Sequence, residues 1–237
     1  MLAEWTPEIR SVPHEATEGA CAVCLGARIG YSTCYKCGMQ WAAHPEFAAA
    51  CDLILPCTVA VSPGLWYSAM LQYKWKGRWA TYAPALAAVL WAWLDEHWAD
   101  LAIALGGPPT LASVVPSRTA TMPTPLYRIA DAQPRLGELL TPAISYDSSA
   151  VEHEWKQRSL HPEAFEVSDD IAGERVLLIE DTWVTGSTAL STAIALRRKK
   201  PQSLALVPIA RMVYEVDMTD AYHVAAASPI DFAAYPR

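Results

Sequence analysis

The sequence has little basic charge and no long uninterrupted apolar segment, and these absences exclude several classes of protein. Its 18 Lys and Arg residues are outnumbered by 25 Asp and Glu residues, which gives a formal net charge of −7. This balance argues against a general nucleic-acid coat, because phosphate backbones are bound by basic surfaces. The most apolar stretch, residues 83–105, is interrupted by acidic residues at positions 95, 96 and 100, so no membrane span is expected.

The start of the chain also lacks the basic residues and the apolar core of a signal peptide. We therefore expect a cytoplasmic protein whose six cysteines are reduced or bound to metal. No internal repeat and no low-complexity tract is present. With 52% hydrophobic and 18% charged residues, the composition is typical of a globular chain with a sizeable core.

The distribution of residue types predicts three parts of the chain. Residues 1–20 are expected to be a loosely ordered lead-in, residues 21–60 a zinc knuckle with its connector, and residues 61–237 the main domain. The main domain alternates helix-like and strand-like segments, which predicts an α/β fold with a doubly wound, mostly parallel sheet. Its clearest expected strands and helices are residues 111–115, 175–179 and 203–209 (strands) and residues 82–104 and 187–198 (helices).

The segment of residues 176–188 carries the strongest functional signal. Four apolar residues predict a buried strand, and Glu180 and Asp181 follow at its carboxyl end, where open α/β sheets bind ligands. Small hydroxyl residues and Gly186 then lead into a helix that begins near Ser187. Free N–H groups at a helix start favour a phosphate, and glycine allows the backbone to approach it closely. We expect a larger side chain at Gly186 to block the phosphate while hardly touching the core.

The side chains of this segment are suited to a ribose phosphate. The hydroxyl groups of Thr185, Ser187 and Thr188 can donate to phosphate oxygens, and Glu180 and Asp181 can accept from two ribose hydroxyls. Two carboxylates beside the sugar also favour the oxocarbenium-like transition state of ribosyl transfer, which glycoside cleavage shares. The alternative interpretation is the strand, polar turn and capped helix of any doubly wound fold.

Four cysteines near the N-terminus form two Cys-x-x-Cys pairs. Cys21 and Cys24 make the first pair, and Cys34 and Cys37 make the second. Four thiolates at this spacing suit a closed, tetrahedral Zn²⁺ site of structural type. Disulfides, chance and a redox Cys-x-x-Cys motif are the alternatives.

Residues 176–188 resemble the phosphoribosyl-pyrophosphate signature of the type I phosphoribosyltransferases, in which four apolar residues precede two acids and a Thr-Thr-Gly-x-Thr loop. Val184 stands where the family often has the first threonine. A four-cysteine knuckle ahead of such a domain resembles the ComF family, which is linked to DNA uptake in competent bacteria. Residues 73–78, 114–117 and 158–165 are similar to further segments of that family, although His161 replaces its Asn.

The resemblance implies a type I phosphoribosyltransferase fold and a glycosyltransferase that binds phosphoribosyl pyrophosphate with Mg²⁺. Such an enzyme transfers the ribosyl phosphate to an acceptor and releases pyrophosphate. Catalysis is expected from Glu180, Asp181 and Arg118. The residues implied in substrate binding are Ser117, Glu180, Asp181, Thr182, Trp183, Val184, Thr185, Gly186, Ser187, Thr188, Lys156 and Arg158.

Two of these groups lie outside the signature. Ser117 and Arg118 fall in the expected pyrophosphate loop, for which a Pro-containing turn with a solvated arginine is the alternative. Lys156 and Arg158 fall in the expected flexible hood over the substrate, for which a solvated surface helix is the alternative.

Two functions of other classes stay open from the sequence. One is a non-catalytic adaptor that senses phosphoribosyl pyrophosphate or a nucleotide, with the knuckle as a docking surface for a protein partner. The other is a DNA-uptake accessory protein, since residues 73–79 interleave basic and aromatic side chains as single-stranded DNA platforms do. An amphipathic element with buried rings explains the same pattern. A homodimer stays open as well.

Overall fold

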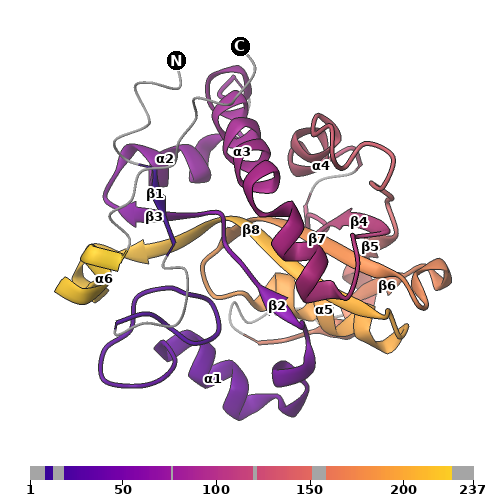
Figure 1. Cartoon of the computed structure of the whole chain (residues 1–237), viewed down its shortest axis with the longest axis horizontal. Coiled ribbons are helices and arrows are strands. Elements are labelled where there is room, and N and C mark those ends of the chain that lie inside the picture. The colour runs from indigo at the N-terminus through magenta and orange to yellow at the C-terminus, as the bar shows by residue number, and fades with distance from the viewer. Residues whose placement is uncertain (1–8, 13–18, 76, 120–121, 151–158, 226–237) are drawn as a thin grey trace.

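The computed structural model describes residues 9–12, 19–75, 77–119, 122–150 and 159–225. These residues form an α/β protein around one central sheet, with strand order β1-β3-β8-β7-β4 and with β2 as a further partner of β8 (Figure 1). Every pairing in this sheet is parallel except that of β1 with β3. The predicted α/β class and the mostly parallel sheet are therefore confirmed.

The strands of the central sheet are β1 (Arg10–Ser11), β2 (Leu53–Ile54), β3 (Thr58–Ser62), β4 (Leu111–Val114), β7 (Arg175–Trp183) and β8 (Ser203–Tyr214). A separate antiparallel pair consists of β5 (Ile144–Tyr146) and β6 (Phe165–Val167). Three of these strands match the apolar runs of the sequence, but β7 and β8 each continue several residues beyond the run that predicts them. The continuation of β7 carries Glu180 and Asp181 within the strand, paired along β8.

The helices are α1 (Tyr35–Ala43), α2 (Leu65–Gln72), α3 (Trp79–Leu105), α4 (Pro125–Asp131), α5 (Ser187–Arg198) and α6 (Asp220–Ala225). The predicted helix at residues 187–198 coincides with α5. The helix predicted at residues 82–104 is one continuous helix, α3, which ends where Gly106 adopts a left-handed conformation. No helix within the described ranges is long and apolar enough to span a bilayer.

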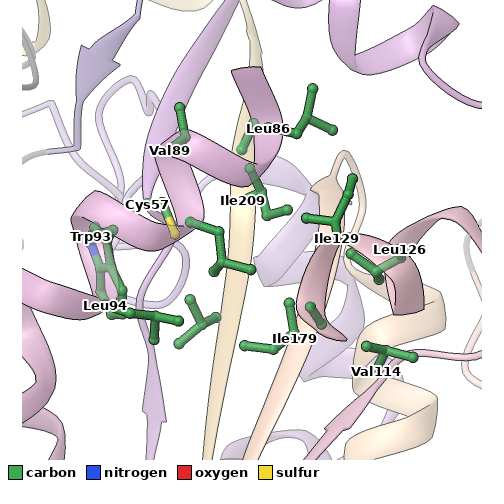
Figure 2. Close-up of a cluster of buried hydrophobic side chains, with 14 of the residues drawn as sticks. Cys57, Leu86, Val89, Trp93, Leu94, Val114, Leu126, Ile129, Ile179 and Ile209 are labelled. Carbon is green, nitrogen blue, oxygen red and sulfur yellow. The ribbon is translucent and has the colours of Figure 1, made fainter. Parts of the chain in front are cut away.

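Two apolar clusters cover the two faces of the sheet, because side chains of successive strand residues point to opposite faces. Leu177 and Ile179 of β7 pack with α3 and α4. Val176 and Leu178 of the same strand pack with α5 on the opposite face. Figure 2 shows the first cluster, where Leu86, Val89, Trp93 and Leu94 of α3 approach Ile179 and Ile209 of the sheet.

The parallel strands bring several loops to one edge of the sheet. The strands β3, β4, β7 and β8 all run in the same direction, so the loops that follow them gather at their carboxyl ends. There β4 ends at Val114, opposite Ile179, while β7 continues to Trp183. Among the residues that the structure describes, the carboxyl end of β7 therefore has β8 on one side and no strand on the other.

Candidate functional site

A cavity of about 610 Å³ opens at this carboxyl edge of the sheet. Its walls come from four segments: the end of α2, the loop after β4, the start of α4, and the end of β7 with the start of α5. The lining residues that the sequence predicts for the site are Ser117, Arg118, Glu180, Asp181, Thr182, Val184, Thr185, Gly186, Ser187 and Thr188. The two predicted loops, far apart in the sequence, thus face one space.

Glu180 and Asp181 line this cavity, and both residues are buried. The β7 strand that carries them has hydrogen-bonded neighbours on both sides up to Ile179, as the apolar run predicts. The Asp181 N–H donates to Glu180 Oε1 over 2.9 Å, and the Thr182 hydroxyl donates to Asp181 Oδ1 over 2.8 Å. One acid is therefore held by the backbone and the other by side chains.

Asp181 also meets two residues that the sequence does not assign to the site. The Tyr73 hydroxyl donates to Asp181 Oδ2, and the Lys74 ammonium forms an ion pair with the same oxygen. Tyr73 is buried, whereas the Lys74 side chain is half exposed at the cavity. Burial and the neighbouring carboxylates raise the pKa of Tyr73, which keeps its hydroxyl a donor.

The two carboxyl groups respond to this environment in opposite directions. Burial, together with the negative charge of Asp181, raises the pKa of Glu180 well above its usual range. Burial also acts to raise the pKa of Asp181, but the attraction of Lys74 and the hydrogen bonds to its oxygens outweigh burial and lower it. The pKa values of the two acids are therefore shifted apart, a difference typical of functional sites.

The loop from Thr185 to Thr188 turns from the sheet into α5 at the cavity. Gly186 is the N-cap of the helix and has a left-handed conformation, with φ of +76°. The Thr185 hydroxyl accepts from the Ser187 N–H over 3.3 Å and lies 3.0 Å from the Ser187 hydroxyl. Thr185 thus caps the first N–H of this 12-residue helix, while the next N–H groups, those of Thr188 and Ala189, have no carbonyl partner within the helix and belong to residues that line the cavity.

Gly186 is more constrained than the sequence predicts. A Cβ built on Gly186 would overlap the indole ring of Trp183, and the positive φ disfavours any other residue. The expectation that a larger side chain there hardly touches the core is therefore wrong. A Gly186→Val variant would strain the backbone and displace Trp183 together with the loop.

Trp183 itself does not line the cavity. Its side chain is fully buried in the cluster that packs against α5, and its indole N–H has no hydrogen-bond partner among the described residues. The sequence predicts Trp183 among the ligand contacts because it lies inside the signature. The structure gives it a packing role beneath Gly186 instead.

Four residues predicted for the substrate site lie outside the segment of residues 176–188. Ser117 and Arg118 lie in the loop after β4 and line the same cavity as Glu180 and Asp181. Lys156 and Arg158 fall outside the described residues.

The four predicted metal ligands come together as one buried cluster. The sulfur atoms of Cys21, Cys24, Cys34 and Cys37 all lie within 4.8 Å of one another, and those of Cys24 and Cys34 are 3.8 Å apart. A Zn²⁺ ion bound at about 2.3 Å by four thiolates holds its sulfurs about 3.8 Å apart. The donor set and its spacing thus fit a tetrahedral metal such as zinc.

Local backbone structure presents these sulfurs. A turn closes the first pair, since the Cys21 N–H donates to the Gly26 carbonyl over 2.8 Å. The second pair begins a helix, because Cys34 is the N-cap of α1 and Cys37 lies in its first turn. Positive helix N-termini favour thiolates, so the fold supports the charged form that binds metal.

Comparison with known proteins gives no family: no protein-family model matches the chain, and no curated protein matches it. The geometry of the two sites carries the functional argument that follows.

We expect purified protein to contain one Zn²⁺ ion per chain, bound by the four clustered cysteines. Elemental analysis should show near-complete loss of zinc in Cys24→Ser, because a closed four-thiolate site does not survive the loss of one ligand. Cys51→Ser is the matched control, since Cys51 lies outside the cluster, and it should keep its zinc. Equal zinc in both variants would contradict this assignment.

The opposite pKa shifts predict opposite effects of removing each acid on stability. The pKa of Glu180 is raised in the folded protein, so the wild type loses stability as pH rises above the usual pKa of a glutamate. Glu180→Gln has no such charge to bury, so it should melt a few degrees higher than the wild type at pH 8. This difference should disappear toward pH 5. The lowered pKa of Asp181 contributes stability at neutral pH, so Asp181→Asn should melt lower there. Calorimetric melting between pH 5 and pH 9 measures both, and changes of the same sign would refute the assignment.

Proposed function

We propose that this protein has a type I phosphoribosyltransferase fold of the ComF-like kind and binds phosphoribosyl pyrophosphate. The observation that carries the proposal is the meeting of three elements in one cavity: the acid pair, the hydroxyl-rich loop at the start of α5, and the loop with Ser117 and Arg118. A cavity of about 610 Å³ lies in the range of small-molecule sites.

Each wall of the cavity suits one part of this substrate. The helix start and the hydroxyls of Thr185, Ser187 and Thr188 suit the 5′-phosphate, since both offer donors to an anion. Glu180 and Asp181 suit the ribose hydroxyls. Arg118 suits the pyrophosphate, because a guanidinium can donate two parallel hydrogen bonds to phosphate oxygens.

The proposed reaction is transfer of the ribosyl phosphate to an acceptor with release of pyrophosphate. The bond from the anomeric carbon to pyrophosphate breaks while the bond to the acceptor forms, and positive charge develops on the sugar between them. The ionised Asp181 stabilises this charge. Mg²⁺ would accompany the diphosphate and neutralise part of its negative charge.

Lys74 gains a role in this proposal that the sequence does not assign to it. Its ammonium pairs with Asp181. A bound diphosphate offers stronger negative charge within the same cavity, so Lys74 can leave Asp181 and meet the leaving group. That exchange exposes the carboxylate to the ribose when the substrate is present.

Thr188→Val tests the phosphate part of the site with little disturbance of packing. We expect this near-isosteric change to weaken the binding of phosphoribosyl pyrophosphate by about tenfold or more, because a hydrogen bond to a charged group is lost. Isothermal titration calorimetry measures the affinity, and melting temperature should change little. Thr192→Val is the matched control, since its hydroxyl donates to the Thr188 carbonyl within α5 and lies outside the cavity lining. Equal loss in both variants would contradict the phosphate assignment.

Pyrophosphate release tests the reaction. With phosphoribosyl pyrophosphate, Mg²⁺ and a panel of bases and amines, we expect release that Asp181→Asn slows by about a hundredfold, the effect of removing one electrostatic stabiliser. Binding of phosphoribosyl pyrophosphate without release of pyrophosphate, whichever acceptor is added, would favour the sensing adaptor. Failure to bind the substrate at all would refute the proposed function.

A further inference from the structure

One buried arginine contacts both the cysteine cluster and the loop of the cavity. Arg211 lies in β8 and is only 3% exposed. Its Nε donates to Cys24 Sγ over 3.2 Å, and its Nη2 lies 3.9 Å from Cys34 Sγ. Its Nη1 donates to the carbonyl oxygens of Trp183 and Val184, over 3.0 and 3.3 Å. A single guanidinium therefore connects the sulfurs of two predicted metal ligands with Trp183 and Val184, the two residues that precede the loop of residues 185–188.

The position of this side chain is tightly defined. A buried charge is costly unless it is paired and hydrogen-bonded, and a metal held by four thiolates carries the net negative charge that Arg211 needs. Gly26 of the knuckle packs against the guanidinium so closely that a Cβ there would overlap it. The guanidinium is thus held between the knuckle and the end of β7.

The loop depends on the carbonyl groups that Arg211 holds. Trp183 and Val184 precede the turn at Gly186, and Gly186 packs on the Trp183 ring. A shift of their peptide groups would move the Thr185 to Thr188 donors that face the cavity. The guanidinium presents its N–H groups in fixed directions, so a movement of the sulfurs is passed on to these carbonyls.

We propose that Arg211 is a positioning residue that couples metal occupancy of the four-cysteine site to phosphate binding at the loop of residues 185–188. The metal fixes the sulfurs, the sulfurs fix the guanidinium, and the guanidinium fixes the start of the loop. This inference rests on the phosphate site of the proposed function. Coupling between two binding equilibria is reciprocal, so a phosphate ligand must raise the affinity for the metal by the factor that the metal raises the affinity for phosphate.

Ribose 5-phosphate is a suitable probe, because its single phosphate fits the proposed loop and competes less for free Zn²⁺ than a pyrophosphate does. The zinc affinity of the wild-type protein is measured by competition with a chelator, with and without saturating ribose 5-phosphate, after a blank without protein. We expect saturation to raise the zinc affinity at least about fivefold, the lower end of typical coupling.

Variants of Arg211 assign the coupling to this residue. Arg211→Met removes the N–H donors of the guanidinium and keeps the aliphatic bulk. Arg211→Lys keeps the positive charge but loses the planar guanidinium, whose N–H groups point at several acceptors at once. In both, zinc affinity should become independent of ribose 5-phosphate. Arg197→Met is the matched control, since Arg197 contacts Ala50 and Asp52 instead of either site, and its coupling should equal that of the wild type.

The outcomes separate this inference from the proposed function. If zinc-loaded wild-type protein does not bind ribose 5-phosphate, the phosphate site fails, and the coupling fails with it. If it binds and the zinc affinity does not change, the coupling alone is overturned. Full coupling in folded, zinc-binding Arg211→Lys would overturn the role of the arginine, and this variant decides the question should Arg211→Met fail to fold.

Discussion

The pairing of β7 with strands of unequal length on its two sides fixes the candidate site. On one side β4 stops opposite Ile179, and on the other side β8 accompanies β7 to its end. A strand supported on one side only can leave its side chains facing an open space while its backbone stays ordered. Glu180 and Asp181 fall on this half-supported stretch, which explains how two carboxyl groups are buried and still border a cavity.

The same arrangement shows why part of the fold can be predicted from the sequence. Residues 175–179 and 187–198 have apolar patterns whose burial follows directly from their composition, and they form strand and helix where expected. The polar residues 180–182 carry no such pattern, and their strand structure comes from the partner β8. Arg211 likewise has the chemistry of a surface residue, and its burial in β8 depends on distant partners, which are the cysteine sulfurs and the carbonyl groups of Trp183 and Val184.

The sequence does not assign Tyr73 and Lys74 to the candidate site, because their place there depends on partners far away in the chain. Tyr73 and Asp181 are 108 residues apart in the chain, and no local pattern relates them. Residues 73–79 show the aromatic and basic mixture expected of either a nucleic-acid platform or an amphipathic element. The contacts of Tyr73 and Lys74 with Asp181 bring two of these side chains to the cavity. Trp183 is the converse case. It lies in the segment predicted to bind ligand, but its ring is buried because its large apolar area favours burial.

The four cysteines of the knuckle pack against the central sheet and α5. A segment of this length cannot bury a sufficient core of its own, so small knuckles commonly rely on a metal. Here all four cysteines belong to the same apolar cluster as Trp183, Leu206 and several residues of α5. The knuckle is therefore packed into the main core on the side where the loop of residues 184–186 enters α5. The cysteines and the end of β7 thus share one apolar cluster, without a separate interface between them.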